Sequence, residues 1–276
     1  MGDGDPDDFY AGIVVDMYGP LGSSVPNLRA DAGPSTIDCA FVNYCHFAVD
    51  IGSRQSNGGS DMDDRTWERY GALGGVWFVV FAVIGGILAG SPPGRSDSPA
   101  DIAKYYADHD SGLQVGAFLG ALGVLGLVWW FGTLWRAMAN AEEATPRVSI
   151  IALVGFILSG VAAMAAFTID AATAAAIDVA GEGSKVFFQM SNISFGFSAL
   201  GDVILTAAVG GLILRTGFLP RWVGYLSYAI AVLALVGAIG IASDASAFTA
   251  FTFLAAAAWG IWIVVIAIVN YRRTAV

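Results

Sequence analysis

The sequence predicts an all-α polytopic membrane protein with six transmembrane helices, and three observations support this fold class. The chain of 276 residues is 56% hydrophobic and 13% charged, and a soluble domain typically has about twice that charged share. Six long segments are apolar enough to cross a bilayer. The arginines fall mainly on alternate connections between these segments. A short amphipathic outer helix between the first two spans and a disordered acidic N-terminal tail complete the prediction.

Five of the six apolar segments contain an uncharged stretch of at least 22 residues, and the remaining one contains only Asp202 in its interior. Each segment supplies the roughly 20 apolar residues that a helix needs to cross a hydrocarbon core of about 30 Å. We expect the spans at about residues 71–91, 112–135, 148–170, 190–214, 222–243 and 248–270.

The N-terminal region has a different composition. Residues 1–61 contain nine Asp and two Arg among many Gly, Ser and Pro, a composition typical of disorder. We therefore assign residues 1–66 to a cytoplasmic tail and residues 67–276 to the membrane domain. The alternative is that Met62 is the true start and that the tail results from a mis-assigned start codon. Cys39, Cys45 and His46 match no common zinc spacing, so we expect no metal there.

The basic residues predict the orientation of the chain. Eight arginines lie in the N-terminal flank, the second and fourth connections and the C-terminus, against three bases on the opposite side. The eight are Arg65, Arg69, Arg136, Arg147, Arg215, Arg221, Arg272 and Arg273, and the three are Arg95, Lys104 and Lys185. The positive-inside rule then places both termini in the cytoplasm. An aromatic belt on the same side is expected from Trp67, Trp129, Trp130, Trp135, Trp222 and Trp262.

One segment carries a polar seam. At about 100° per residue, Ser191, Ser194, Ser198, Asp202 and Thr206 lie within roughly a third of a turn of one another. Such a seam should face protein or a water-filled pocket, because a carboxylate facing lipid is costly. Ser159, in the middle of the third span, is a candidate partner. We predict a polar pocket here that binds a proton or a cation, and the alternative is a protonated Asp202 that joins helices by hydrogen bonds.

The second span begins with glycines on one face. Gly112, Gly116, Gly120 and Gly123 are followed on that face by Gly126, and small residues at this spacing let helices approach closely. The pairs Gly71/Gly75 and Gly86/Gly90 repeat this spacing in the first span. We assign these glycines to helix packing.

The first outer connection predicts a short helix. Ser98 is a typical N-cap, Pro99 suits the first helical position, and Asp101 follows three residues after the cap. We expect this helix to rest at the outer surface. The outer acids are either a solvated surface or a site for a cation or a basic partner. They are Asp97, Asp101, Asp108, Asp110, Asp170, Asp178, Glu182 and Asp244, with His109 among them.

Three stretches resemble a broad set of six-helix bacterial integral membrane proteins known as domains of unknown function. These stretches are Asp101–Tyr106, Leu134–Arg136 and Thr216–Tyr225, the last containing Gly-Phe-Leu-Pro-Arg-Trp. The resemblance covers about Trp67–Tyr271 and leaves out the tail. It implies the six-helix architecture and carries no activity or catalytic residue.

These features restrict the function. No basic stripe for nucleic acid is present, and residues 67–276 contain no common hydrolase or nucleotide-binding motif. We expect no catalytic residue and no cofactor. The favoured hypothesis is a small transporter, permease-like or accessory protein with a polar pocket at Asp202. The alternative is a membrane scaffold or regulatory protein that forms homo-oligomers or binds a membrane protein. A membrane enzyme with an outward acidic site ranks third.

Overall fold

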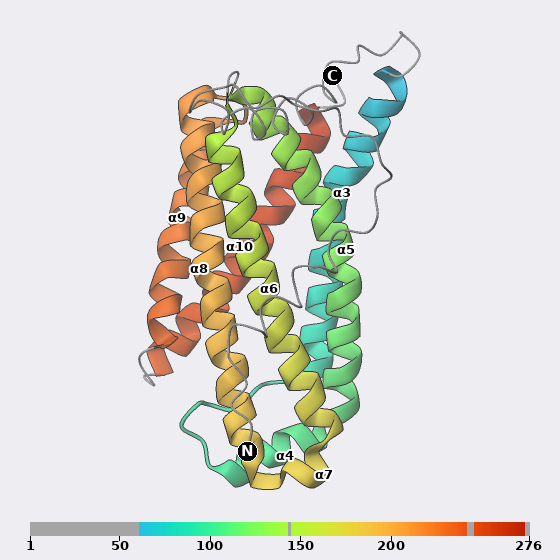
Figure 1. Ribbon diagram of the computed structural model, residues 1–276, viewed down its shortest axis with the longest axis vertical. Coiled ribbons are helices and arrows are strands. Elements are labelled where there is room, and N and C mark those ends of the chain that lie inside the picture. Colours follow the sequence, from blue (N-terminus) through green and yellow to red (C-terminus); the bar gives the residue numbers. More distant parts are fainter. Residues whose placement is uncertain (1–60, 143–144, 242–245, 274–276) are drawn as a thin grey trace, which may run out of the picture. The chain divides into compact units, whose positions relative to one another are not determined.

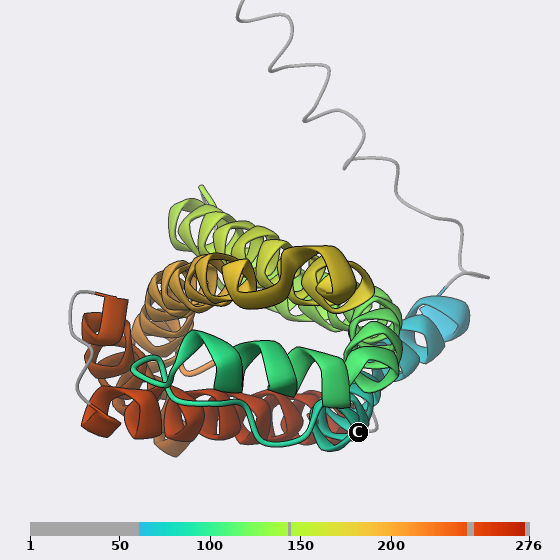
Figure 2. The same cartoon turned by 90° about the horizontal axis from the view of Figure 1, so that it is seen from below.

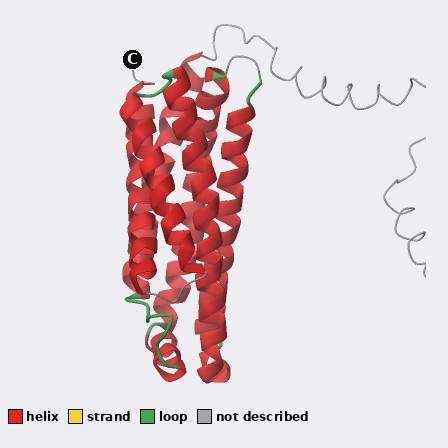
Figure 3. Cartoon of the chain, turned by 90° about the vertical axis from the view of Figure 1, so that its left-hand side faces the viewer, coloured by secondary structure: helices red, strands yellow, loops and turns green. Residues whose placement is uncertain are grey.

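The computed structural model describes residues 61–142, 145–241 and 246–273, all within one compact unit, Gly58–Val276. Residues 1–60 of the predicted tail, which include Cys39 and Cys45, and Asp244 lie outside the described residues. The described part contains helices and no strand (Figure 3). The predicted all-α fold class is confirmed.

Six helices are long and apolar enough to cross a membrane, which confirms the multi-pass prediction. Their bounds are α3 Asp61–Ala89, α5 Asp110–Ala141, α6 Arg147–Ala175, α8 Ser184–Thr216, α9 Arg221–Ala238 and α10 Ser246–Arg273. Shorter helical elements are α4 Pro99–Asp108, α7 Ile177–Ala180, η1 Gly181–Gly183 and η2 Ile239–Ile241. Successive long helices run in opposite directions (Figure 1).

Several helix boundaries differ from the sequence prediction. Helix α5 ends at Ala141, α6 ends at Ala175 and α8 begins at Ser184, each five or six residues beyond the predicted span. Helix α3 begins at Asp61, so it includes residues 61–66 that we had assigned to the tail. Acidic residues are favourable in the first turn of a helix, because its N-terminus carries partial positive charge, and this segment starts with three Asp in four residues. Helix α9 ends at Ala238 and is followed by the 3-10 turn η2, several residues before the predicted end at 243.

The long helices form a closed ring in chain order. Each one packs against the next, and α10 returns to contact α3. The end view shows this ring, with α4 lying across one end of it (Figure 2). We call that end the capped end. We call the opposite end the arginine end. It contains the starts of α3, α6 and α9 and the ends of α5, α8 and α10.

The main hydrophobic core lies toward the arginine end. It includes Leu205, Val209 and Ile213 of α8, which lie between Asp202 and Arg215. Trp130 and Trp262 are fully buried in it, with ring centroids 5.8 Å apart. The prediction that these two tryptophans belong to an interfacial belt is therefore wrong. Trp129, Trp135 and Trp222 are exposed at this end, as a belt requires. The side chain of Trp67 is not among those described.

The glycine face of α5 is divided between two neighbours. A Cβ at Gly116 would lie 3.0 Å from the carbonyl oxygen of Gly85, and one at Gly126 would lie 2.7 Å from that of Gly74. Gly112 and Gly123 also face α3, at Leu88 and Phe78, whereas Gly120 faces Phe167 of α6. On α3, Gly74 and Gly85 face the backbone of α5, and the predicted packing pair Gly71 and Gly75 also faces α5, at Thr133 and Trp130. At Gly86, by contrast, a Cβ would meet nothing within 4 Å.

Helix α4 begins as predicted but packs differently. The Ser98 hydroxyl accepts a hydrogen bond from the Asp101 amide at 3.2 Å, and Pro99 occupies the first turn. Ile102 and Tyr106 have no exposed surface and belong to a second core cluster with Leu113 and Phe188. The helix therefore caps the bundle through its apolar face, where we had expected it to rest on the membrane surface.

Candidate functional site

Helices α6 and α8 make the closest contact around the predicted polar seam. A Cβ at Gly155 would lie 2.6 Å from the amide nitrogen of Leu205, and a Cβ at Gly201 would meet the backbone of Ser159. Contacts this short leave space for glycine only. The two backbones therefore approach closely on one side of Asp202, and Ser159 is brought beside the carboxylate.

Three of the predicted pocket residues come together here. The Ser159 hydroxyl donates a hydrogen bond to Oδ1 of Asp202 at 2.6 Å, and its oxygen lies 3.1 Å from the Ser198 hydroxyl. Ser159 and Ser198 are buried, whereas Asp202 is half-buried. Among the described residues, Asp202 forms no ion pair, and its carboxylate partner is the neutral hydroxyl of Ser159. We call Ser159, Ser198 and Asp202 the Asp202 group.

The carboxylate of Asp202 faces the interior of the bundle. On α8, the side chains of Phe197, Leu200 and Ile204 are exposed and mark the outer face of the helix. Asp202 is two residues from both Leu200 and Ile204. At about 100° per residue it lies roughly 160° around the helix from each of them. The remaining exposed part of Asp202 is therefore directed away from the lipid-facing side.

The other two predicted pocket residues do not join this group. The Thr206 hydroxyl donates to the carbonyl oxygen of Asp202 at 2.7 Å, and the Ser194 hydroxyl donates to that of Met190 at 3.0 Å. Both bonds run back to the carbonyl four residues earlier in the same helix, a common arrangement for Ser and Thr inside helices.

Comparison with protein-family models, with curated proteins and with solved structures finds no match for this chain. The function must therefore be argued from the geometry of the chain itself.

A second buried polar group, which the sequence did not indicate, lies at the capped end. Asp170 of α6 accepts hydrogen bonds from the hydroxyls of Tyr106 and Ser191, both at 2.7 Å. We had counted Asp170 among the outer solvated acids and Ser191 with the seam of Asp202. The structure instead pairs them with each other. The only sequence signal was the apolar face of α4, which places Tyr106 toward the bundle.

The tyrosines of α4 hold this cap in place. Burial and the charge of Asp170 raise the pKa of Tyr105 to about 12, and they also raise the pKa of Tyr106, which bonds to Asp170. Both hydroxyls are therefore protonated at neutral pH and act as donors. Tyr105 donates to the carbonyl oxygen of Ala89 at the end of α3, at 3.0 Å. The cap is thus joined to α3 and α6 by two buried hydrogen bonds.

His109 and Asp101 have structural partners. The ring nitrogen Nδ1 of His109 lies 3.1 Å from the carbonyl oxygen of Tyr105, and Asp101 accepts a hydrogen bond from Ser98 at 2.7 Å. Within the described ranges, no three His, Cys, Asp or Glu side chains gather in a way that would hold a metal ion. The geometry at this end therefore favours a closed cap.

Proposed function

We propose that this membrane protein is a small transporter or permease-like protein, in which the Asp202 group binds a proton or a small monovalent cation. One observation supports this proposal most. A half-buried carboxylate on a membrane-spanning helix faces the bundle interior and, among the described residues, accepts its side-chain hydrogen bond from Ser159, which also contacts Ser198. An ionised side chain at the centre of a membrane helix costs about 2.5–3.5 kcal/mol on insertion scales. Acids kept at such a cost commonly mark ion or proton pathways.

The proposed location is a bacterial cytoplasmic membrane with both termini in the cytoplasm. The excess of arginine at the arginine end supports this orientation, because cytoplasmic connections are enriched in Lys and Arg. In this orientation the cap formed by α4 faces outward, and Asp202 lies roughly 20 Å along α8 from Arg215.

A scaffold is the second candidate, and the packing of α6 on α8 favours it. Gly155 and Gly201 bring the two backbones into contact next to the bond between Ser159 and Asp202. A hydrogen bond in such a contact joins helices, and buried side-chain hydrogen bonds in membrane proteins contribute about 0.6 kcal/mol on average. In a scaffold, the only role of Asp202 would be to join α6 and α8 through this hydrogen bond.

The variant Asp202→Asn distinguishes the two functions. Asparagine keeps the shape and an acceptor for Ser159 but cannot bind or release a proton at neutral pH. We expect wild-type proteoliposomes to change internal pH when a Na⁺ or K⁺ gradient is imposed, and we expect the variant to lose this response with an unchanged melting temperature. The measurement is the fluorescence of entrapped pyranine, a pH-sensitive dye.

Ser194→Ala is the matched control, because it removes a seam hydroxyl that bonds only to its own helix. It should retain the wild-type response. If wild-type vesicles show no ion-dependent pH change while Asp202→Asn lowers the melting temperature, the scaffold is correct and the transporter is rejected.

A further inference from the structure

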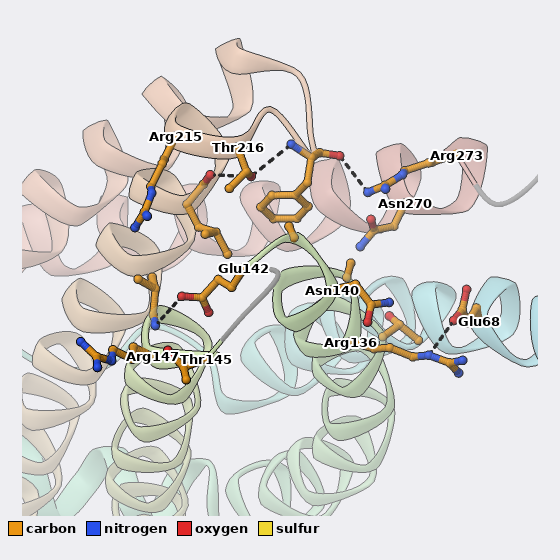
Figure 4. Close-up of a pocket in the computed structure, with 16 residues that line it drawn as sticks. Glu68, Arg136, Asn140, Glu142, Thr145, Arg147, Arg215, Thr216, Asn270 and Arg273 are labelled. Carbon is orange, nitrogen blue, oxygen red and sulfur yellow. Dashed lines mark hydrogen bonds and ion pairs between the residues drawn. The ribbon is translucent and has the colours of Figure 1, made fainter. Parts of the chain in front are cut away.

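The arginine end contains a cavity of about 990 Å³ that includes none of the Asp202 group. Its walls come from the start of α3 and α6, the ends of α5, α8 and α10, and the connections between them (Figure 4). This volume is at the upper end of the range for small-molecule sites, about 300–1,000 Å³. The cavity therefore has room for a ligand much larger than a single inorganic ion.

Positive charge predominates around this cavity. Arg147 of α6 and Arg215 of α8 lie on one side, and Arg136 of α5 and Arg273 of α10 lie on the other (Figure 4). Two acids, Glu68 and Glu142, also line it. Four guanidinium groups against two carboxylates give the described residues of the lining a formal charge of +2.

Both acids are engaged in bonds of their own. Glu68 forms an ion pair with Arg136 at 3.2 Å. Glu142 accepts hydrogen bonds from the amides of Val148 and Ser149, both at 2.9 Å, and from the Ser149 hydroxyl at 2.6 Å. Neither Arg147 nor Arg215 forms an ion pair with an acid in the described part of the chain. These two arginines therefore keep donors for another anion.

Glu142 shows that this wall of the cavity stabilises negative charge. Burial alone would raise the pKa of Glu142, but the bonds from Ser149 and Val148 and the charge of Arg215 lower it overall. The donors are the first free amides of α6, where the helix dipole also favours an anion. A carboxylate of the chain is thus held beside Arg215 in the way an anionic ligand would be.

Further donors line the opposite wall. Arg273 donates one hydrogen bond, to the carbonyl oxygen of Phe218 at 2.8 Å, and a guanidinium carries five N–H groups. Asn270 is only 6% exposed and lies beside Arg273 in the lining. Charged and neutral donors therefore line the cavity on both sides.

We propose that this cavity binds a phosphate-bearing anion, either the headgroup of an anionic phospholipid or a soluble phosphate compound. Arginine matches phosphate well because its planar group donates two parallel hydrogen bonds to phosphate oxygens. The cavity lies at the ends of the spans, where lipid headgroups are found, and basic pockets between membrane helices are known to bind anionic headgroups. The site is independent of the transport or scaffold function proposed above.

The test uses the purified full-length chain in detergent. Native mass spectrometry measures binding of phosphatidylglycerol against phosphatidylcholine, and calorimetry measures binding of inorganic pyrophosphate. In the double variant Arg147→Gln/Arg215→Gln, we expect affinity for the bound anion to fall at least about tenfold, because hydrogen bonds between charged groups are lost. Loss of phosphatidylglycerol alone identifies the lipid headgroup, and loss of pyrophosphate alone identifies a soluble phosphate compound.

The matched control is Arg221→Gln/Arg272→Gln, which removes two exposed arginines at the same end but outside the cavity lining. It should change affinity by less than about twofold. An equal loss in both double variants would assign binding to general surface charge and overturn the proposal. Failure of the wild-type chain to prefer phosphatidylglycerol over phosphatidylcholine, together with no pyrophosphate binding, would also overturn it. Equal melting temperatures would show that the variants are folded.

Discussion

Gly201→Ala is expected to cause a large loss of stability. The new Cβ would meet the Ser159 backbone and lie 2.8 Å from the carbonyl oxygen of Gly155. Backbone atoms inside a helix cannot move aside without moving α6 as a whole. Overpacking of this kind typically costs 1–3 kcal/mol, and we expect about 3 kcal/mol here. The apparent melting temperature in detergent, followed by circular dichroism, should fall by about 6 °C or more.

Gly160→Ala is the control for this prediction. Gly160 is in α6, next to Ser159, and a Cβ there would meet nothing within 4 Å. The melting temperature of this variant should equal that of the wild type or exceed it, because alanine favours a helix over glycine. Equal effects of the two substitutions would contradict the close packing of α6 against α8.

The double variant Gly112→Ala/Gly126→Ala should separate α3 from α5. A Cβ at Gly112 would meet the carbonyl oxygen of Leu88, and one at Gly126 would lie 2.7 Å from that of Gly74 and from the ring of Trp77. Because the two collisions lie at different points of the interface, no single shift of α3 relative to α5 relieves both. We expect a destabilisation of about 3 kcal/mol or more, measured again as a lower melting temperature.

Gly132→Ala on the same helix tests whether the contact, and not the loss of glycine, causes this effect. A Cβ at Gly132 would meet nothing within 4 Å, so its melting temperature should stay near the wild-type value. A stable double variant would show that α3 and α5 are not in close contact.

Hydropathy and local helix signals predicted most of the fold. Six helices correspond to the six uncharged or nearly uncharged segments, since the cost of burying charge in lipid restricts where charged residues occur. Ser98, Pro99 and Asp101 marked the start of α4 because capping depends on neighbouring residues only. The burial of Trp130 and Trp262 was not predictable in this way. Both lie in the half of their spans that is nearer the arginine end, and only the folded chain shows that their rings meet.

The candidate site was predictable in part. A charge at Asp202 in an apolar helix indicated a polar contact, and Ser159 was named as its candidate partner. Thr206 and Ser194 fit the same helical face, but their hydroxyls bond to their own backbone, a choice that helical periodicity does not reveal. Asp170 lay close enough to a span end to resemble a solvated acid. Its partner Tyr106 is 64 residues away, so only the folded chain brings them together.

The cavity at the arginine end was also not predictable from the sequence. Arg136, Arg147, Arg215 and Arg273 were predicted to share one side of the membrane, and counting them indicated orientation. A count gives no distance between side chains on different helices. The ring arrangement of the helices is what gathers these four around one cavity.

The alternation of the six spans is the central claim, and labelling of single cysteines tests it most directly. With Cys39 and Cys45 changed to serine, one cysteine is placed at Glu182, between α6 and α8, and in a second variant at Arg272, at the end of α10. Both side chains are exposed. A membrane-impermeant maleimide should label Glu182→Cys on intact cells and Arg272→Cys only after lysis. Labelling of both positions from the same side of the membrane would contradict the six-span arrangement.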